Sequence, residues 1–130
     1  MISFSVKSSK NSELIDITDG LRRQTKKNGF SEGVLFIFVP HTTCAIICNE
    51  NEQNLKEDFI ELFSLLKGRK WRHNSVDSNA EAHLLNSIFK NSAFVFVSKG
   101  ELQLGTWQSI MLAELDGPRE RKILMDFIPR

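Results

Sequence analysis

The start of the chain has the hydrophobic pattern of two strands and a helix. Residues 2–7 alternate between apolar and polar side chains, which is the two-residue period of a strand with one buried face. Residues 13–18 are a second short strand candidate. We expect a helix capped by Thr18 or Asp19 to follow. It should end before Gly29, because glycine accepts the left-handed conformation that helix C-termini often adopt.

The middle of the chain predicts two strands and a long amphipathic helix. Residues 33–39 are rich in β-branched and aromatic side chains, which favour a strand, and Pro40 ends it. Residues 42–49 form the next apolar strand. Between residues 55 and 66 the apolar side chains recur at helical spacing, and Gly68 follows as a stop signal.

A loop, a second amphipathic helix and a run of strands complete the predicted elements. Residues 69–77 have no hydrophobic period and predict a loop. Ser78 and Glu81 match a capping box, in which two side chains satisfy free amides at the start of a helix. Short turns containing glycine then separate four apolar segments. These segments are residues 93–98, 101–104, 106–115 and 121–128.

The order of these elements predicts an α+β domain built on antiparallel sheets, because parallel βαβ alternation does not persist along the chain. With 130 residues and no Pro-, Gly- or Ser-rich linker, we expect one domain spanning residues 1–130. A hydrophobic fraction of 41% is sufficient for a core without disulfides or a structural metal.

Charge and hydropathy limit the partners that we expect. The formal net charge is +1, which gives no electrostatic reason for general binding to nucleic acid or to anionic membranes. The first ten residues lack the pattern of a signal peptide, and no apolar run reaches the ~18 residues of a membrane span. We therefore expect a cytoplasmic protein without membrane association.

Cys44 and Cys48 are expected to be reduced thiols. In a strand their Cα atoms would be roughly 13 Å apart at ~3.3 Å per residue, and this exceeds the ~7 Å limit for a disulfide. Both should point to the same face and serve as small buried apolar side chains. Metal ligation or nucleophilic catalysis is the alternative. Free thiols are consistent with a reducing compartment.

The three histidines lie beside boundaries of the predicted elements. His41 is at the junction of two strands, His73 is in the loop, and His83 is in the first turns of the following helix. Functional side chains are common at such ends, because the scaffold fixes them while they remain accessible. Three neutral imidazoles would suit Zn²⁺, Ni²⁺ or Fe²⁺ with one position open. The spacing lacks an HExxH motif, so three unrelated surface or core histidines are the alternative.

Oxygen-bearing candidates for catalytic residues are Glu50, Asp77 and Asn79. Asp77 and Asn79 flank the predicted capping serine, where helix amides concentrate partial positive charge. Either could hold a water molecule or orient a histidine. Ordinary hydrogen bonding within a loop turn is the alternative. Glu81 is more simply explained by the capping box.

Turns near the C-terminus suggest a phosphate site. Glycine lets backbone amides approach an anion closely, and arginine can bind phosphate through two parallel hydrogen bonds. The candidate phosphate-binding residues are Lys99, Gly105, Thr106 and Arg119. Ordinary hairpin turns with solvated or salt-bridged cations are the alternative.

Four motifs follow one another in an order that is more specific than any one of them. They are His41-Thr42-Thr43 running into Asn49-Glu50-Asn51, then His73 with Asn79-Ala80-Glu81-Ala82-His83, then Leu104-Gly105-Thr106-Trp107-Gln108, and finally Asp116-Gly117-Pro118-Arg119. Together they resemble the YjbQ family across residues 33–128. This chain departs from the family by having Trp71 and Arg72 before His73, where a tyrosine is usual.

The resemblance implies a β-sandwich with helices packed outside, a shared site for the three histidines, and a compact homotrimer with sites near subunit boundaries. Some family members are linked to a weak thiamine phosphate synthase activity, which joins a pyrimidine diphosphate to a thiazole phosphate and releases pyrophosphate. The implied enzyme would place a divalent metal at His41, His73 and His83 and use Lys99 and Arg119 to neutralise pyrophosphate.

The metal and the reaction each have alternatives. Zinc or another transition metal suits imidazole ligands, whereas magnesium, the other possibility, prefers oxygen. A metal-dependent hydrolase acting on a phosphorylated small molecule would use Glu50 or Asp77 to transfer the proton. A non-catalytic protein that binds a metal or a phosphorylated metabolite is the third hypothesis.

Overall fold

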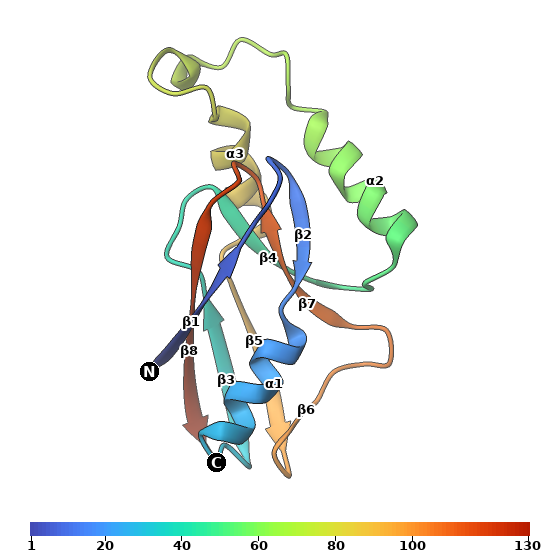
Figure 1. The fold of residues 1–130 in the computed structure, drawn as a ribbon, viewed down its shortest axis with the longest axis vertical. Coiled ribbons are helices and arrows are strands. Elements are labelled where there is room, and N and C mark those ends of the chain that lie inside the picture. The colour runs from blue at the N-terminus through green and yellow to red at the C-terminus, as the bar shows by residue number, and fades with distance from the viewer.

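Two antiparallel sheets form the framework of the fold in a computed structural model of residues 1–130 (Figure 1). Sheet A has the strand order β1-β8-β3-β5-β6, and sheet B has the order β2-β7-β4. The strands of sheet A are β1 (Ile2–Lys7), β8 (Glu120–Pro129), β3 (Gly33–Phe38), β5 (Ser92–Ser98) and β6 (Glu101–Leu102). Those of sheet B are β2 (Glu13–Asp16), β7 (Ser109–Glu114) and β4 (Cys44–Asn49).

Three α-helices and one short 3₁₀ helix connect the strands. The helices are α1 (Thr18–Lys27), α2 (Gln53–Ser64), η1 (Arg72–Ser75) and α3 (Ala80–Phe89). Gly29 follows α1 with φ of 67°, the left-handed conformation predicted for this helix end. No helix of the structure is long and apolar enough to cross a membrane.

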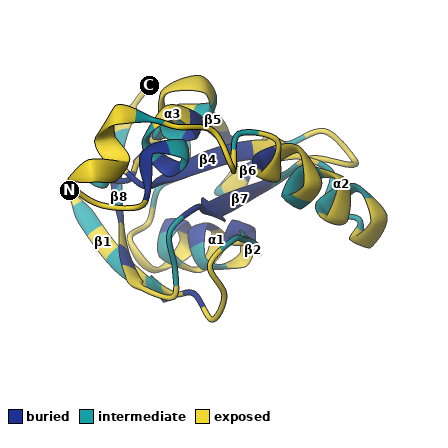
Figure 2. Cartoon of the chain, turned by 90° about the horizontal axis from the view of Figure 1, so that it is seen from above, coloured by how far each residue is buried: buried dark blue, intermediate teal, exposed yellow.

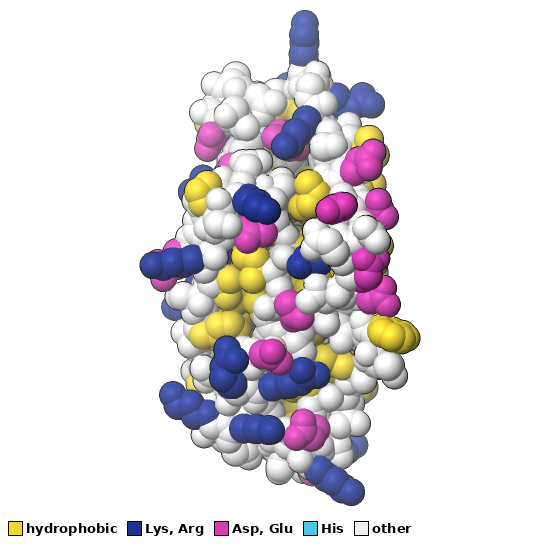
Figure 3. Space-filling view, turned by 45° about the vertical axis from the view of Figure 1, so that its right-hand side comes forward, with side chains coloured by type: hydrophobic (Ala, Val, Ile, Leu, Met, Phe, Trp, Pro, Cys, Tyr) yellow, Lys and Arg dark blue, Asp and Glu magenta, His cyan; other side chains and the backbone are white.

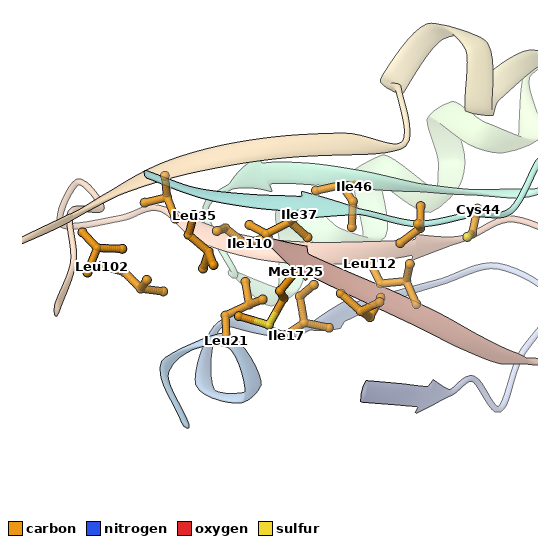
Figure 4. Packing of buried hydrophobic residues seen from close by; sticks show 14 residues of the cluster. Ile17, Leu21, Leu35, Ile37, Cys44, Ile46, Leu102, Ile110, Leu112 and Met125 are labelled. Atoms are coloured by element: carbon orange, nitrogen blue, oxygen red, sulfur yellow. The ribbon is translucent and has the colours of Figure 1, made fainter. Parts of the chain in front are cut away.

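The main core lies between the two sheets. Leu35 and Ile37 of β3, Ile110 and Leu112 of β7, and Met125 of β8 are buried in it (Figure 4). In sheet A only every second residue faces this layer, which explains the alternation of apolar and polar residues along β1 and β8.

A second core lies between sheet B and the helices. Phe63 of α2 and Leu85 of α3 pack against Ile47 of β4 and Met111 of β7. Sheet B is therefore buried on both faces, and Figure 2 shows β4 and β7 largely in the buried colour. Burial on both faces explains why these strands have continuous apolar sequences, since no residue in their centre faces water.

The predicted α+β sandwich with helices outside is confirmed, but the predicted capping box at the start of α3 is wrong. The helix begins at Ala80 with Asn79 in the capping position, and Asn79 makes no side-chain bond to the helix amides. The Oδ1 atom of Asn74 accepts the hydrogen bond from the Ala80 amide instead, at 3.0 Å. The preceding 3₁₀ turn supplies this acceptor, so Ser78 is not needed as a cap.

The cysteine prediction is confirmed for Cys44 and wrong for Cys48. Both are free thiols, but Cys44 is buried and Cys48 is exposed. The two side chains have the same parity on β4, yet the buried part of this strand ends at Ile47. Strand parity alone therefore does not determine burial at a strand end.

The outer face of sheet A carries a group of exposed apolar side chains. We define the aromatic face as Phe36 and Phe38 of β3, Phe94 and Phe96 of β5, and Ile128 of β8, all of which are exposed. The rings of Phe36 and Phe94 are cross-strand neighbours with centroids 6.2 Å apart. Elsewhere the surface is mixed, and Figure 3 shows acidic and basic side chains scattered over one face.

Candidate functional site

Four segments that are distant in the sequence meet at one end of the sandwich, at the top of Figure 1. They are the β3–β4 loop with His41, η1 with His73, the N-terminal part of α3 with His83, and the β7–β8 turn at residues 115–119. Strand lengths place these loops together, because β3, β7 and β8 all begin or end here. The predicted positions of His41 between two strands and of His83 in the first turns of a helix are confirmed, whereas His73 lies in the 3₁₀ helix η1 and not in an irregular loop.

His73 and His83 form a pair. Their ring centroids are 4.7 Å apart and their planes are inclined by 78°, an edge-to-face arrangement. They line a pocket of about 370 Å³ whose other lining residues are Trp71, Arg72, Ala80 and Leu84. The indole Nε1 of Trp71 donates to the carbonyl of Leu66 at 3.0 Å, which holds this ring in place. The pocket thus combines two imidazoles, one guanidinium and an aromatic ring.

A chain of hydrogen bonds orients the His73 ring. Nε2 of His73 lies 3.0 Å from Oδ1 of Asn79, and Nδ2 of Asn79 donates to Oδ2 of Asp116 at 2.9 Å. The guanidinium of Arg119 donates to the same Asp116 oxygen at 3.1 Å and to the Asp116 carbonyl at 2.8 Å. Asn79 is only 7% exposed, so its amide is held between histidine and carboxylate and is shielded from solvent.

His41 is held apart from this pair by a different hydrogen bond. Its Nε2 accepts from the backbone amide of Lys122 on β8 at 2.9 Å. Burial lowers the pKa of His41, and the positive charge of Arg121 lowers it further. A neutral imidazole has a single lone pair in the ring plane, and here the Lys122 amide occupies it. His41 could bind a metal only after its ring turned away from β8.

The donor set of one chain fits a metal in part. No three His, Cys, Asp or Glu side chains converge closely enough to hold an ion. His73 and His83 are adjacent, and imidazole pairs suit transition metals. The shared site for all three histidines stays a prediction, since it needs either a different His41 rotamer or a ligand from another subunit.

Of the predicted carboxylates, the structure brings Asp77 close to the site. Asp77 follows η1, and its backbone amide donates to the His73 carbonyl at 3.1 Å, while its side chain is exposed. Glu50 follows β4 at the end opposite His41, and the five steps from Cys44 to Asn49 alone span roughly 16 Å at ~3.3 Å per residue. Within one chain, Glu50 therefore does not join the histidines.

The predicted phosphate-binding residues are divided between the two ends of the sandwich. Arg119 is in the β7–β8 turn at the histidine end. Lys99 is in the β5–β6 turn at the opposite end, where its backbone amide donates to Glu32. Gly105 and Thr106 belong to the β6–β7 connection, and the Gly105 amide donates to the Gln108 side chain at 2.8 Å. One chain does not assemble these four residues around one anion.

Sequence reasoning missed the roles of Asp116 and Arg72. Asp116 stood in a recognised motif as an ordinary turn residue, and its contact with Asn79 joins positions 37 apart. Arg72 stood out only as a departure from the family pattern before His73. The structure brings both into the site because η1 packs against α3, and Asn79 at the start of α3 contacts Asp116.

Comparison with known proteins shows relatives along the whole chain. The family model described as UPF0047 protein YjbQ-like matches residues 2–130. A UPF0047 protein of Archaeoglobus fulgidus is 40% identical over 126 residues, which cover 95% of this chain and 98% of the relative. The UPF0047 protein YugU of Bacillus subtilis is 37% identical over 120 residues, which cover 89% of each chain.

Solved structures of similar proteins have the same fold. A hypothetical protein of Aeropyrum pernix is 41% identical, with a TM-score of 0.95 over 98% of this chain and 97% of the other. A protein of unknown function from Sulfolobus solfataricus, described as YbjQ-like, is 39% identical, with a TM-score of 0.95 over 99% of this chain and 96% of the other.

Proposed function

This chain belongs to the UPF0047 YjbQ-like protein family, and we propose that the pocket around His73 and His83 binds and hydrolyses a phosphorylated small molecule with the help of a divalent transition metal. The observation behind this proposal is the pairing of His73 with His83 in a pocket that also contains Arg72 and Trp71. No comparable group of imidazole and guanidinium side chains surrounds the larger groove between β2 and α2.

The pocket residues suit an anionic substrate with a flat or apolar part. Arg72 can bind a phosphate through two parallel hydrogen bonds. Trp71 and Leu84 give the same pocket an apolar surface for the remainder of the molecule. A volume of about 370 Å³ suits one small molecule of this kind.

His73 and His83 would hold the metal, together with a third ligand. That ligand is His41 after a change of ring orientation, or a side chain of another subunit. A transition metal at imidazole ligands would act as a Lewis acid toward the phosphate. Zinc fits these donors better than magnesium, which prefers oxygen ligands. Asp77, whose backbone amide contacts His73, would accept a proton from an attacking water, whereas Glu50 is remote.

We also propose that the protein assembles as a homotrimer through the aromatic face. Four phenylalanine side chains exposed on one sheet face are unusual for a monomer. Lys122 and Asp126 lie on the outward side of β8, so one face carries both signs of charge beside its apolar residues. In a cyclic trimer the contacts are heterologous, so this face would meet a different patch of the neighbouring copy.

Metal content and turnover test the proposed function together. We expect about one transition metal ion per subunit in the native protein, and loss of metal in His73→Ala and His83→Ala variants that remain folded. Leu84→Ala is the matched control, because Leu84 lines the same pocket without a metal-binding atom. It should keep the metal and change only substrate affinity. Unchanged metal content in both histidine variants would refute the metal site.

Assays of phosphate release and of pyrophosphate release distinguish the reactions. Phosphate release from simple phosphomonoesters that falls in Arg72→Ala supports the hydrolase. Pyrophosphate release that requires both a pyrimidine diphosphate and a thiazole phosphate supports thiamine phosphate synthase instead. Bound metal without turnover in either assay favours a binding protein and contradicts the proposed hydrolysis.

A further inference from the structure

Asp116 is linked to His73 through the side-chain amide of Asn79. We infer that Asp116 is a positioning residue that fixes His73 as the Nε2–H tautomer and leaves Nδ1 as its free nitrogen. The inference depends on the proposed function only for what Nδ1 binds.

The contact with Asp116 sets the orientation of the Asn79 amide. A carboxylate only accepts hydrogen bonds, so the group that faces Oδ2 of Asp116 at 2.9 Å must be the Nδ2 donor of Asn79. The guanidinium of Arg119, which only donates, also contacts this Oδ2 at 3.1 Å, so the Asp116 oxygen acts as an acceptor toward both neighbours. Burial of Asn79 excludes solvent as a competing partner. The amide therefore has one favoured orientation.

The orientation of the Asn79 amide in turn sets which nitrogen of the His73 ring carries the proton. With Nδ2 facing Asp116, Oδ1 of Asn79 faces Nε2 of His73 at 3.0 Å. An amide oxygen only accepts, so Nε2 must carry the proton. The lone pair of neutral His73 is then on Nδ1. Metal-binding histidines commonly donate their other ring N–H to an oxygen in this way, which raises ligand basicity and fixes the ring.

The contact between Asn79 and His73 differs from helix capping. Asparagine in a capping position normally accepts a hydrogen bond from the first helix amides, and the loss of such a bond costs ~1 kcal/mol. Asn79 occupies that position but makes no such bond, and Asn74 accepts from the Ala80 amide instead. The Asn79 side chain is thus free to join His73 to Asp116.

Nitrogen NMR of the imidazole rings tests the inference without substrate or metal. Two-bond ¹H–¹⁵N correlation spectra at about pH 8, above the ordinary histidine pKa, should show His73 in the wild type with a protonated Nε2 and an unprotonated Nδ1. If the wild-type spectrum shows the proton of His73 on Nδ1, the inference is overturned. This measurement needs no variant.

Variants that alter or exchange the side chains of Asn79 and Asp116 provide a sharper test. In Asp116→Asn the new amide can donate or accept, so the Asn79 amide can turn over and His73 should become a mixture of tautomers. The double variant Asn79→Asp with Asp116→Asn restores an acceptor beside Nε2 and a donor beside residue 79. The double variant should therefore recover the Nε2–H tautomer. Asp77→Asn is the control, since it removes a nearby exposed carboxylate without touching the chain of hydrogen bonds.

Zinc titration separates failure of this inference from failure of the proposed function. If both hold, Asp116→Asn should weaken zinc binding by about 10- to 100-fold, and the double variant should recover most of that loss. A wild-type Nε2–H tautomer that Asp116→Asn disrupts, in a protein that binds no zinc, supports the inference and contradicts the metal site. An unchanged His73 tautomer in Asp116→Asn contradicts the inference even if zinc binds.

Discussion

The guanidinium of Arg121 on β8 and the carboxylate of Glu114 on β7 form a buried ion pair that connects the two sheets. Nε of Arg121 lies 2.9 Å from Oε1 of Glu114, and these residues are 3% and 0% exposed. Ser8 donates to Glu114 at 2.7 Å, and Arg121 donates to the Thr43 hydroxyl and carbonyl. The pair therefore fixes β7, β8 and the β3–β4 loop beside the histidines.

Removal of one partner of this pair should strongly destabilise the protein. Glu114→Gln leaves the buried charge of Arg121 without a counter-ion, and we expect a loss of about 3–5 kcal/mol in the free energy of unfolding, measured by urea denaturation. Replacement of both residues, by Glu114→Gln with Arg121→Met, should cost less than the single change. A single variant as stable as the wild type would contradict this account.

The same ion pair should weaken in acid. Burial alone would raise the pKa of Glu114, but hydrogen bonds from Arg121 and Ser8 and the charge of Arg121 outweigh it and lower the pKa below its ordinary value. A carboxyl with a lowered folded pKa stabilises the fold above its unfolded pKa of about 4.5. This contribution is lost as the pH falls through the folded value.

His41 should make stability depend on pH at a higher range. Burial and the charge of Arg121 lower its pKa below 6.5, so the unfolded chain takes up a proton first. The contribution of His41 to the free energy of unfolding is then fully present above about pH 6.5. It decreases as the pH falls from there through the pKa that His41 has in the folded protein. As the pH is lowered from 6.5 in chelator-treated protein, the melting temperature of His41→Gln should fall less than that of the wild type. Equal slopes would show that His41 does not contribute.

The two thiols should differ in reactivity. Burial raises the pKa of Cys44 to about 11, whereas Cys48 is exposed. Because the thiolate is the reactive form, iodoacetamide should modify the native protein once, at Cys48, and modify Cys44 only after unfolding. Mass spectrometry of the wild type and of Cys48→Ser measures this. Rapid modification of native Cys48→Ser would contradict the burial of Cys44.

Gly117 should be essential for the turn that carries Asp116. A Cβ atom at this position would lie 2.3 Å from the Lys10 carbonyl and 2.7 Å from Ser8 Oγ. Gly117→Ala must therefore displace the β1–β2 turn or the β7–β8 turn, and we expect a loss of about 1–3 kcal/mol in thermal or urea unfolding.

A second glycine provides the control for that measurement. At Gly105 the nearest atoms to an added Cβ, at 3.3–3.6 Å, belong to the flexible Gln108 side chain. Gly105→Ala should change stability by less than about 0.5 kcal/mol. Similar losses in the two variants would argue against a specific close approach at Gly117.

The aromatic face should determine the oligomeric state. Phe94→Lys places a charge on this face, beside the rings of Phe36 and Phe96, and we expect the variant to be smaller than the wild type in size-exclusion chromatography with light scattering. Leu65→Lys is the matched control, because Leu65, which follows the C-terminal end of α2, is 66% exposed, close to the 61% of Phe94. A wild type that remains a monomer at high concentration would refute assembly through this face.

Local patterns were sufficient to predict most of the fold. The alternation in β1, the apolar spacing of α2 and the glycine after α1 each depend on neighbouring residues, and each prediction is confirmed. The errors occurred where local signals compete. Ser78 satisfies the capping-box pattern, but the folded 3₁₀ turn brings Asn74 closer to the helix amide.

The sequence by itself determined the fold class and the placement of the three histidines at element ends, because hydrophobic period and turn residues act over a few positions. Only the tertiary structure decided which histidines meet and what each ring nitrogen contacts. His41 bonds to an amide 81 positions away, and Asn79 to a carboxylate 37 positions away. Such pairs depend on how the two sheets pack and where their turns end. No local sequence pattern encodes contacts between residues so far apart in the chain.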